Sequence, residues 1–266
     1  SDGRIGLGAH NAIAVFDDFQ ARALAATLPY FDDFEDGEAD FFGAATGRWM
    51  VNRWGRYRAD PESAGSDSIA LLDLSGPLPA DLQIGVTLKG KTGPSGYLTN
   101  ALVIFDYHGP DDFKFAGGFF GANQWRLGHF DGSNWITDIS LAEPIAVDVD
   151  YDVEVVLTGT RAWLKVNGAE KLNFNFAADA LNDGRIGLGT RRAIAVFDNL
   201  AVEASPVPLT GAAAESVAAS IASAAADRAL VAPSEWIAAF NLLESFEEGP
   251  LKTLFAELLE DAPLRP

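Results

Sequence analysis

The sequence predicts a mainly β protein: a sandwich of two antiparallel sheets followed by a small module of three helices. Three observations carry this prediction. Short apolar runs separated by turn signals fill residues 31–203, without a stretch of helical periodicity. One run, AVDVDYDVEVVL at 146–157, alternates strictly between apolar and acidic residues, as a half-buried strand does. After residue 204 the chain becomes rich in alanine and strongly helix-forming.

Individual strands can be placed in order by their local patterns. LQIGVTL at 82–88 predicts one strand, and ALVIFDY at 101–107 predicts a strand that is buried on both faces. Asp131-Gly132 and Asn167-Gly168 each stand between two β-rich runs. Both dipeptides predict tight hairpins, because their residues tolerate the left-handed backbone of such turns.

The C-terminal part has a different character. Residues 204–210 contain two prolines and predict a linker. The alanine-rich stretch after it predicts a first helix, Ser234 is placed to cap a second, and Gly249-Pro250 ends that helix and opens a third. The expected module covers 211–262. Its apolar helical faces are expected to form a core, with a partner-binding face as the alternative.

A repeated phrase suggests a tandem arrangement. DGRIGLGAHNAIAVFDDF at 2–19 matches DGRIGLGTRRAIAVFDNL at 183–200 in 13 of 18 positions. RIGLG and AIAVFD are expected to be two strands that close the sandwich. Residues 1–20 are therefore predicted to be the closing hairpin strands of a preceding repeat, with 21–30 as linker and a period of about 180 residues. These strands either lie against their own domain or exchange into a neighbouring chain.

Composition excludes several classes of function. The 266 residues are 48% hydrophobic, which suffices for a sizeable core. The absence of cysteine excludes disulfides and cysteine-bound zinc. A formal net charge of −19 disfavours nucleic acid, since phosphates select Lys and Arg. No run of about 18 apolar residues predicts a membrane span.

Three separated blocks carry a family resemblance. FDDFEDG at 31–37, followed by GRW and GRY, opens the domain; the aromatic-rich segment 101–135 is its centre; and GRIGLGTRRAIAVFDNLAV at 184–202 ends it. Over 31–203 the chain resembles the laminin-G-like, concanavalin-A-like jelly-roll domains of large secreted bacterial repeat proteins. The resemblance implies a jelly-roll sandwich and a location outside a prokaryotic cell or on its surface.

Catalytic residues are not predicted. The superfamily contains glycan-binding modules, adhesin modules and some glycoside hydrolases, so the resemblance leaves function open. Its laminarinase-type hydrolases carry E-x-D-x-x-E on one strand, and this chain lacks that motif. The acidic row at 148–154 is instead expected to be a solvated strand face. RIGLG lacks the spacing of a dinucleotide loop, and its glycines are expected to allow close strand packing.

The resemblance also implies a calcium site. Jelly rolls of this kind often hold a structural Ca²⁺ where the first and last strands meet, bound by oxygen ligands. Asp33, Asp36 and Asp198 are the ligands predicted here. The alternative is that these acids are ordinary strand-end and turn residues.

A glycan site is predicted in the central segment. Sugar sites combine exposed aromatic rings with polar side chains that bind hydroxyl groups. Tyr107, His129, Asp131, Asn134 and Trp135 are the predicted contacts. Trp135, beside the Asp131-Gly132 turn, is expected to be the exposed tryptophan and Trp125 the buried one. The alternative is that these aromatic rings belong to the core.

Together these features predict a non-enzymatic extracellular protein with a structural or adhesive role. It would be a subunit of a repeat array, fibre or surface layer, with copies of itself or neighbouring repeats as partners, assembling through strand exchange. The alternative is a glycan-binding adhesin module, and a further alternative is a glycoside hydrolase.

Overall fold

The computed structural model describes residues 10–11, 13–15, 17, 25–176 and 180–205. Within these residues the chain forms fifteen β-strands and one short 3₁₀ turn. In chain order they are β1 (Tyr30–Asp32), β2 (Phe42–Thr46), β3 (Arg48–Val51), β4 (Tyr57–Asp60), β5 (Ser68–Leu72), β6 (Asp81–Lys91), β7 (Ala101–Gly109), β8 (Asp112–Phe119), η1 (Phe120–Ala122), β9 (Gln124–Phe130), β10 (Trp135–Ala142), β11 (Tyr151–Thr158), β12 (Arg161–Val166), β13 (Ala169–Asn175), β14 (Arg185–Thr190) and β15 (Ile194–Ala204).

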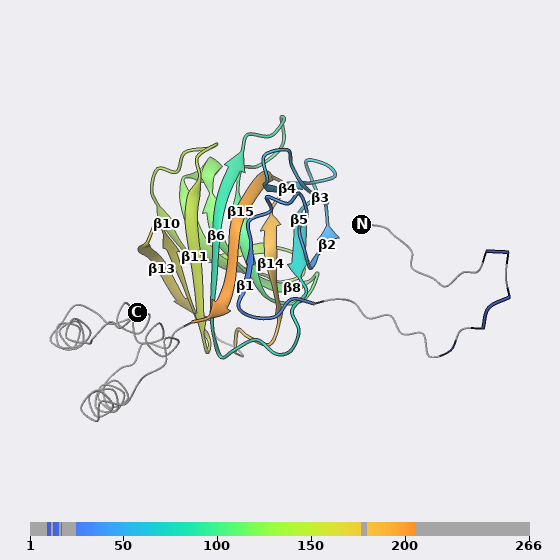
Figure 1. Cartoon of the computed structure of the whole chain (residues 1–266). Coiled ribbons are helices and arrows are strands. Elements are labelled where there is room, and N and C mark those ends of the chain that lie inside the picture. Colours follow the sequence, from blue (N-terminus) through green and yellow to red (C-terminus); the bar gives the residue numbers. More distant parts are fainter. Residues whose placement is uncertain (1–9, 12, 16, 18–24, 177–179, 206–266) are drawn as a thin grey trace, which may run out of the picture.

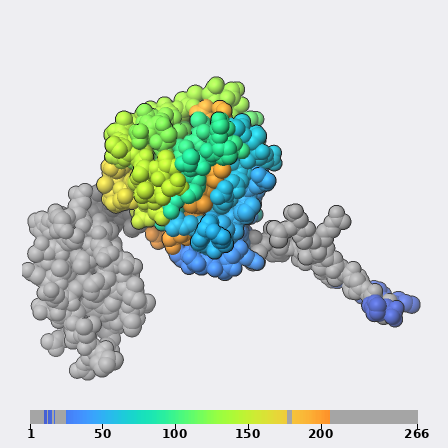
Figure 2. All heavy atoms as spheres, turned by 90° about the horizontal axis from the view of Figure 1, so that it is seen from above, coloured from blue at the N-terminus to red at the C-terminus, as the bar shows by residue number. Residues whose placement is uncertain are grey.

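The strands build two sheets that pack face to face (Figure 1). The first sheet has the order β13-β12-β11-β6-β15-β4-β3, with β1 also paired to β15. The second has the order β10-β9-β8-β7-β14-β5-β2. All pairings between these strands are antiparallel. The predicted two-sheet antiparallel sandwich is confirmed, and Figure 2 shows residues 25–205 as one compact body.

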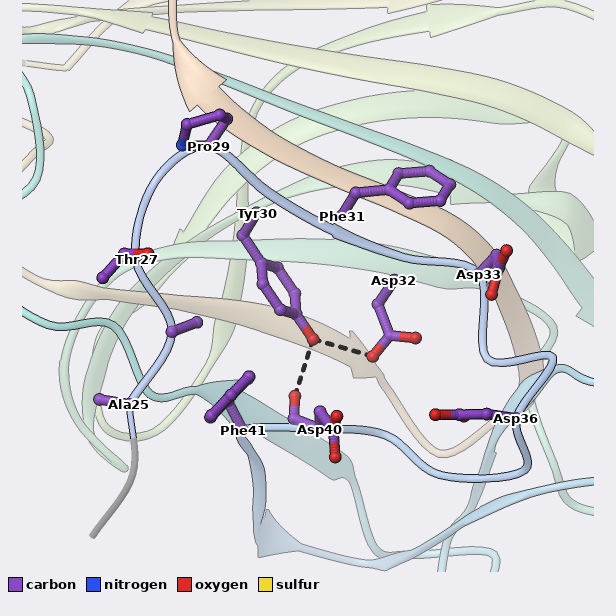
Figure 3. A pocket seen from close by; sticks show the side chains of 11 residues that line it. Ala25, Thr27, Pro29, Tyr30, Phe31, Asp32, Asp33, Asp36, Asp40 and Phe41 are labelled. Atoms are coloured by element: carbon purple, nitrogen blue, oxygen red, sulfur yellow. Dashed lines mark hydrogen bonds between the residues drawn. The ribbon is translucent and has the colours of Figure 1, made fainter. Parts of the chain in front are cut away.

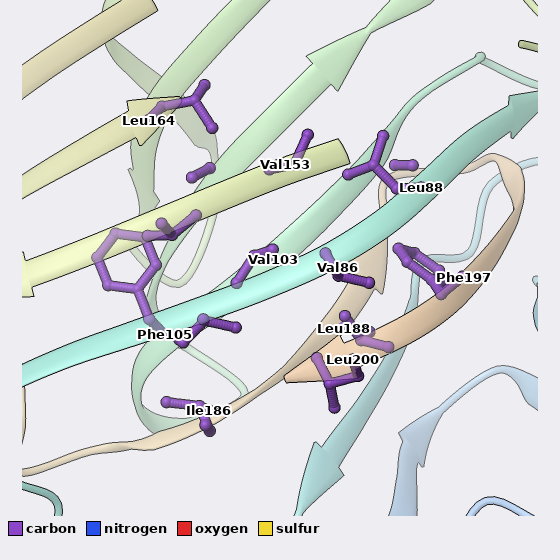
Figure 4. Packing of buried hydrophobic residues seen from close by; sticks show 14 of the residues in the cluster. Val86, Leu88, Val103, Phe105, Val153, Leu164, Ile186, Leu188, Phe197 and Leu200 are labelled. Carbon is purple, nitrogen blue, oxygen red and sulfur yellow. The ribbon is translucent and has the colours of Figure 1, made fainter. Parts of the chain in front are cut away.

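Apolar side chains from both sheets fill the space between the layers. β6 alternates strictly, with Leu82, Ile84, Val86 and Leu88 buried and the residues between them only partly covered. Figure 4 shows side chains of β7, β14 and β15 packing around those of β6. Full burial of one such side chain contributes about 1.5–3 kcal/mol relative to exposure. The inward face of each strand is therefore the main source of stability.

Local patterns predicted several elements correctly. The strands expected at 82–88 and 101–107 are β6 and β7, and the Asp131-Gly132 turn joins β9 to β10. Asn167 and Gly168 join β12 to β13 with φ of +50° and +77°. The strand expected at 146–157 begins only at Tyr151, because the chain turns through the left-handed backbone of Asp148, whose φ is +63°.

The two strands that close the sandwich do not form the hairpin that the sequence analysis expected. β14 pairs with β5 and β7 in the second sheet, whereas β15 pairs with β1, β4 and β6 in the first. The short turn between them therefore carries the chain from one sheet to the other. The two halves of the repeated phrase, which form β14 and β15, therefore lie on opposite sides of the core.

The remaining predicted parts lie mostly outside the described residues. Of the N-terminal copy at 1–20, only residues 10–11, 13–15 and 17 are described, and they lie clear of the sandwich in Figure 2. Ile13 and Val15 are 101% and 92% exposed, whereas their counterparts Ile194 and Val196 belong to β15. The helical module predicted at 211–262 falls entirely outside. None of the described helical structure is long and apolar enough to cross a membrane.

Candidate functional site

A hollow of about 620 Å³ opens beside β1, where the first strand meets the last (Figure 3). β1 pairs with β15 in the register Tyr30↔Val202, so these strands are neighbours as predicted. The hollow is lined by Ala25, Ala26, Thr27, Pro29, Tyr30, Phe31, Asp32, Asp33, Asp36, Asp40 and Phe41. It thus brings four carboxylates and three aromatic rings together.

Tyr30 is the fixed donor of this hollow. Its ring packs edge-on against Phe41 with ring centroids 5.9 Å apart. Its hydroxyl lies 2.8 Å from Asp32 Oδ2 and 2.8 Å from the carbonyl oxygen of Asp40. Burial raises the pKa of Tyr30, and the hydrogen bond to Asp32 and the nearby carboxylates raise it further, since they would repel a phenolate. The phenol therefore remains neutral.

The carboxylates are held by the backbone of their own loop. Phe34 N–H donates to Asp32 Oδ1 at 2.8 Å, Glu35 N–H to Asp33 Oδ1 at 3.2 Å, and Glu38 N–H to Asp36 Oδ1 at 2.9 Å. Each carboxylate keeps further lone pairs that can accept hydrogen bonds. Figure 3 shows Asp36 directed toward the hollow and Asp32 directed toward the Tyr30 hydroxyl.

Burial raises the pKa of Asp32. The hydrogen bonds from Phe34 and Tyr30 oppose this shift, while the charges of Asp36 and Asp40 add to it. Phe31, which is 61% exposed, offers an apolar ring at the margin. The arrangement can therefore hold a ligand that has both an apolar face and several hydrogen-bond donors.

The predicted calcium ligands are only partly brought together. Asp33 and Asp36 line the hollow, but Asp198 is not among the lining residues. Asp198 Oδ2 lies 3.5 Å from Arg56 Nε; burial raises the pKa of Asp198 and the Arg56 charge opposes that shift. The three acids do not form a group of converging ligand atoms among the described residues. Calcium binding by Asp33 and Asp36 stays a prediction.

The predicted glycan residues lie around the second sheet, whose outer face carries an apolar cluster of its own. The buried members of this outer cluster are Ile69, Leu71, Leu102, Ile104, Phe113, Phe115 and Phe119. Tyr107, Phe130 and Trp135 pack against it. Their rings are therefore largely engaged with the protein's own side chains.

Trp135 is half-buried rather than the exposed platform that the sequence analysis expected. Its ring packs on Phe113 and Phe115 at centroid distances of 5.3 and 5.0 Å, and its Nε1–H donates to Asp67 Oδ2 at 2.9 Å. Asp67 immediately precedes β5, five strands away from β10 in sheet order. A flat sheet would separate those strands by about 24 Å, at about 4.8 Å per strand. The second sheet therefore curls over its outer face and closes Trp135 against Asp67.

Trp125 is 1% exposed, so its predicted burial is confirmed. Tyr107 stacks on Phe113 at a centroid distance of 5.7 Å, at the margin of the outer cluster. His129 lies on the other face of β9, which alternates between core and outer residues, and its Nδ1 is 2.7 Å from Asp138 Oδ2. The structure therefore separates His129 from Tyr107 and Trp135.

Asp131 and Asn134 shape the β9–β10 turn. Asp131 Oδ1 accepts hydrogen bonds from the N–H groups of Asn134 and Ser133 at 2.7 and 2.9 Å, and these bonds lower the pKa of Asp131. Since the turn itself uses this carboxylate, the five predicted glycan contacts do not form one shared surface.

Four residues that line the hollow are not among the site residues that the sequence predicted: Tyr30, Phe31, Asp32 and Asp40. Phe31 and Asp32 belong to FDDFEDG at 31–37, which combines acids with aromatic residues, and Tyr30 directly precedes this segment. The sequence analysis interpreted Asp33 and Asp36 of this segment as calcium ligands, with strand-end and turn residues as the alternative.

Comparisons with known proteins show the fold. No family model matches the chain, and no curated protein matches it. The carbohydrate-binding module CBM66 from Bacillus subtilis is similar with a TM-score of 0.54 and 16% identity, over 68% of this chain and 100% of that one. A Bacillus subtilis protein of unknown function with a galectin-like fold is similar with a TM-score of 0.52 and 12% identity, over 66% of this chain and 94% of that one. The chain thus shares a jelly-roll β-sandwich fold with these two proteins, and neither of them tests the finer laminin-G-like resemblance.

Proposed function

We propose that this protein binds a carbohydrate in the hollow beside β1 and does not cleave it. One observation carries the proposal: the exposed Phe31 ring, the Tyr30 side chain and four carboxylates all belong to the lining of a single hollow. Sugars present apolar ring faces and several hydroxyl groups, and such a site can engage both. Its volume, about 620 Å³, lies within the range of about 300–1,000 Å³ that is usual for ligand sites. The shared fold with the carbohydrate-binding module supports the same class of ligand.

Replacing Phe31 by Ala is expected to weaken glycan binding about tenfold or more. Burying a Phe side chain contributes about 1.5–3 kcal/mol, and about 1.4 kcal/mol corresponds to a factor of ten. A glycan array of neutral, amino and acidic oligosaccharides identifies a ligand, and calorimetry then compares the variants. Trp54→Ala is the matched control, because Trp54 is 64% exposed and is not among the residues lining the hollow. Equal losses for both variants, or an array without a hit, would contradict the proposal.

Acidic sugars are expected to bind at least tenfold more weakly than neutral ones at low salt. The four carboxylates of the hollow repel an anionic ligand, and this repulsion is screened by salt. The measurement compares a neutral oligosaccharide with its uronic-acid counterpart, on the native protein and on Asp33→Asn/Asp36→Asn. The difference in affinity between the neutral and the acidic oligosaccharide is expected to be smaller for the double variant than for the native protein. Preferential binding of the uronic acid would show that the hollow is not the site.

Glycoside hydrolysis is the competing function, and Asp32 would be its acid. A carboxyl group whose pKa burial raises is a candidate proton donor. However, Asp32 accepts hydrogen bonds from Phe34 and Tyr30, which favour its ionised form. Chromatography of the bound oligosaccharide after long incubation separates the two functions: intact sugar supports binding, and shorter products lost in Asp32→Asn establish hydrolysis.

The extracellular location and the structural role in an array or fibre belong to the same proposal. The repeat of 13 identical positions in 18 supports the structural role in an array. The mass of the native particle, with and without residues 1–20, tests the role. Large particles that dissociate on truncation support strand exchange, and an unchanged monomer rejects it.

A further inference from the structure

We propose a second ligand site, for a divalent transition metal such as Zn²⁺, formed by Asp106, His108 and Asp183. None of these residues lines the hollow beside β1, so the site is independent of the proposed carbohydrate binding. Asp106 and His108 belong to the end of β7. Asp183 lies just before β14, near the lower end of the β14 arrow in Figure 1. One ligand atom from each of the three residues lies within 4.8 Å of the others.

The observed separations fit a metal centre. His108 Nε2 lies 3.1 Å from Asp106 Oδ1 and 3.4 Å from Asp183 Oδ1. Zinc bonds to nitrogen and oxygen are about 2.0–2.2 Å long, which places neighbouring ligand atoms of a tetrahedral site about 3.3 Å apart. One imidazole and two carboxylates make a zinc-like ligand set, whereas Ca²⁺ and Mg²⁺ prefer oxygen alone. Three protein ligands leave a fourth position for water.

The backbone presets Asp106 for this role. The register of β7 shifts between Phe105 and Gly109, and Asp106 itself has a φ of +50°, in the left-handed region that Asp tolerates better than most residues. Such bulges redirect side chains next to functional sites. The Asp106 side chain is 4% exposed, and its Oδ2 pairs with Lys114. Lys114 therefore fixes the carboxylate while Oδ1 faces His108.

Close backbone packing places Asp183 in the same way. A Cβ on Gly184 would lie 2.5 Å from the carbonyl carbon of Asp106 and 2.6 Å from the nitrogen of Tyr107. Only glycine allows this approach, which sets the preceding Asp183 against the end of β7. Backbone geometry thus places Asp106 and Asp183 beside each other, and the side chains of His108 and Asp183, which are 40% and 60% exposed, remain accessible to a metal from solvent.

The test is calorimetry with ZnCl₂ on the full chain after chelator dialysis. One Zn²⁺ per chain is expected, with affinity reduced at least tenfold by His108→Ala and by Asp183→Asn. His129→Ala is the matched control, since His129 is 37% exposed beside a single carboxylate and His108 is 40% exposed beside two. The His129→Ala variant should bind Zn²⁺ with the same affinity as the native protein.

Two results would overturn the metal site: absence of Zn²⁺ uptake, or uptake that His108→Ala and His129→Ala reduce equally. The first would show that the three side chains form only a hydrogen-bonded cluster and hold no metal. Should His108→Ala fail to fold, NMR of the native chain replaces it. Zn²⁺ must then shift the ring resonances of His108 and leave those of His10 and His129 in place. These results do not depend on carbohydrate binding, so failure of either proposal is recognised separately.

Discussion

Lys114→Met is expected to lower the free energy of unfolding by about 3–5 kcal/mol, because it leaves a buried carboxylate without its counter-charge. The side chains of Asp106 and Lys114 are 4% and 14% exposed, and they form a direct ion pair. The Lys114 ammonium also lies 5.7 Å from the centre of the Phe176 ring. Urea denaturation of the native and variant chains measures the loss.

Two controls separate the buried charge from the loss of a lysine. Asp106→Asn/Lys114→Met removes both charges and is expected to recover most of the stability, since Asn also tolerates the left-handed backbone at this position. Lys91→Met breaks an ion pair with Asp148 whose side chains are 35% and 48% exposed, and it should cost less than about 1 kcal/mol. If Lys114→Met costs no more than Lys91→Met, the pair is hydrated in solution.

The sandwich itself was predictable because its signals are local. The alternation of β6 and the turn at Asn167-Gly168 each depend on a few adjacent residues and on general backbone preferences. The neighbouring positions of the first and last strands followed from the fold class. Local signals do not report which sheet a strand joins, and β14 and β15 accordingly joined different sheets where a hairpin was expected.

The sites were less predictable because they depend on register and sheet curvature. β15 carries a register shift between Asp198 and Ala201, and the φ of Asn199 is +49°. At this irregularity Asp198 lies beside Arg56, and it does not line the hollow with the predicted partners Asp33 and Asp36. The sequence of the strand alone does not predict such a bulge. The exposure of Trp135 likewise depended on the curl of the second sheet toward Asp67, which no segment of the sequence encodes alone.

Close strand packing explains the glycines of RIGLG, as the sequence analysis expected. Gly187 lies in β14 between β5 and β7, and a Cβ there would stand 2.1 Å from the carbonyl oxygen of Ala70 and 3.0 Å from the Cα of Leu71. Both atoms belong to the backbone of β5, so rotation of a side chain cannot relieve the contact. Adding a methyl group therefore pushes two paired strands apart at the centre of the sheet.

Gly187→Ala is expected to lower the free energy of unfolding by about 3 kcal/mol, at the upper end of the cost of overpacking. Gly43→Ala is the matched control, because Gly43 lies in β2 with no heavy atom within 4 Å of its added Cβ, and it should change stability by less than about 0.5 kcal/mol. Equal effects would mean that β14 does not pack tightly on β5. Gly6 occupies the same place in the N-terminal copy of the phrase. If residues 2–19 close a sandwich as β14 and β15 do, Gly6→Ala should lower the free energy of unfolding of that sandwich in the same way. Comparing Gly6→Ala with Gly187→Ala and Gly43→Ala therefore tests whether the two copies of the phrase pack alike.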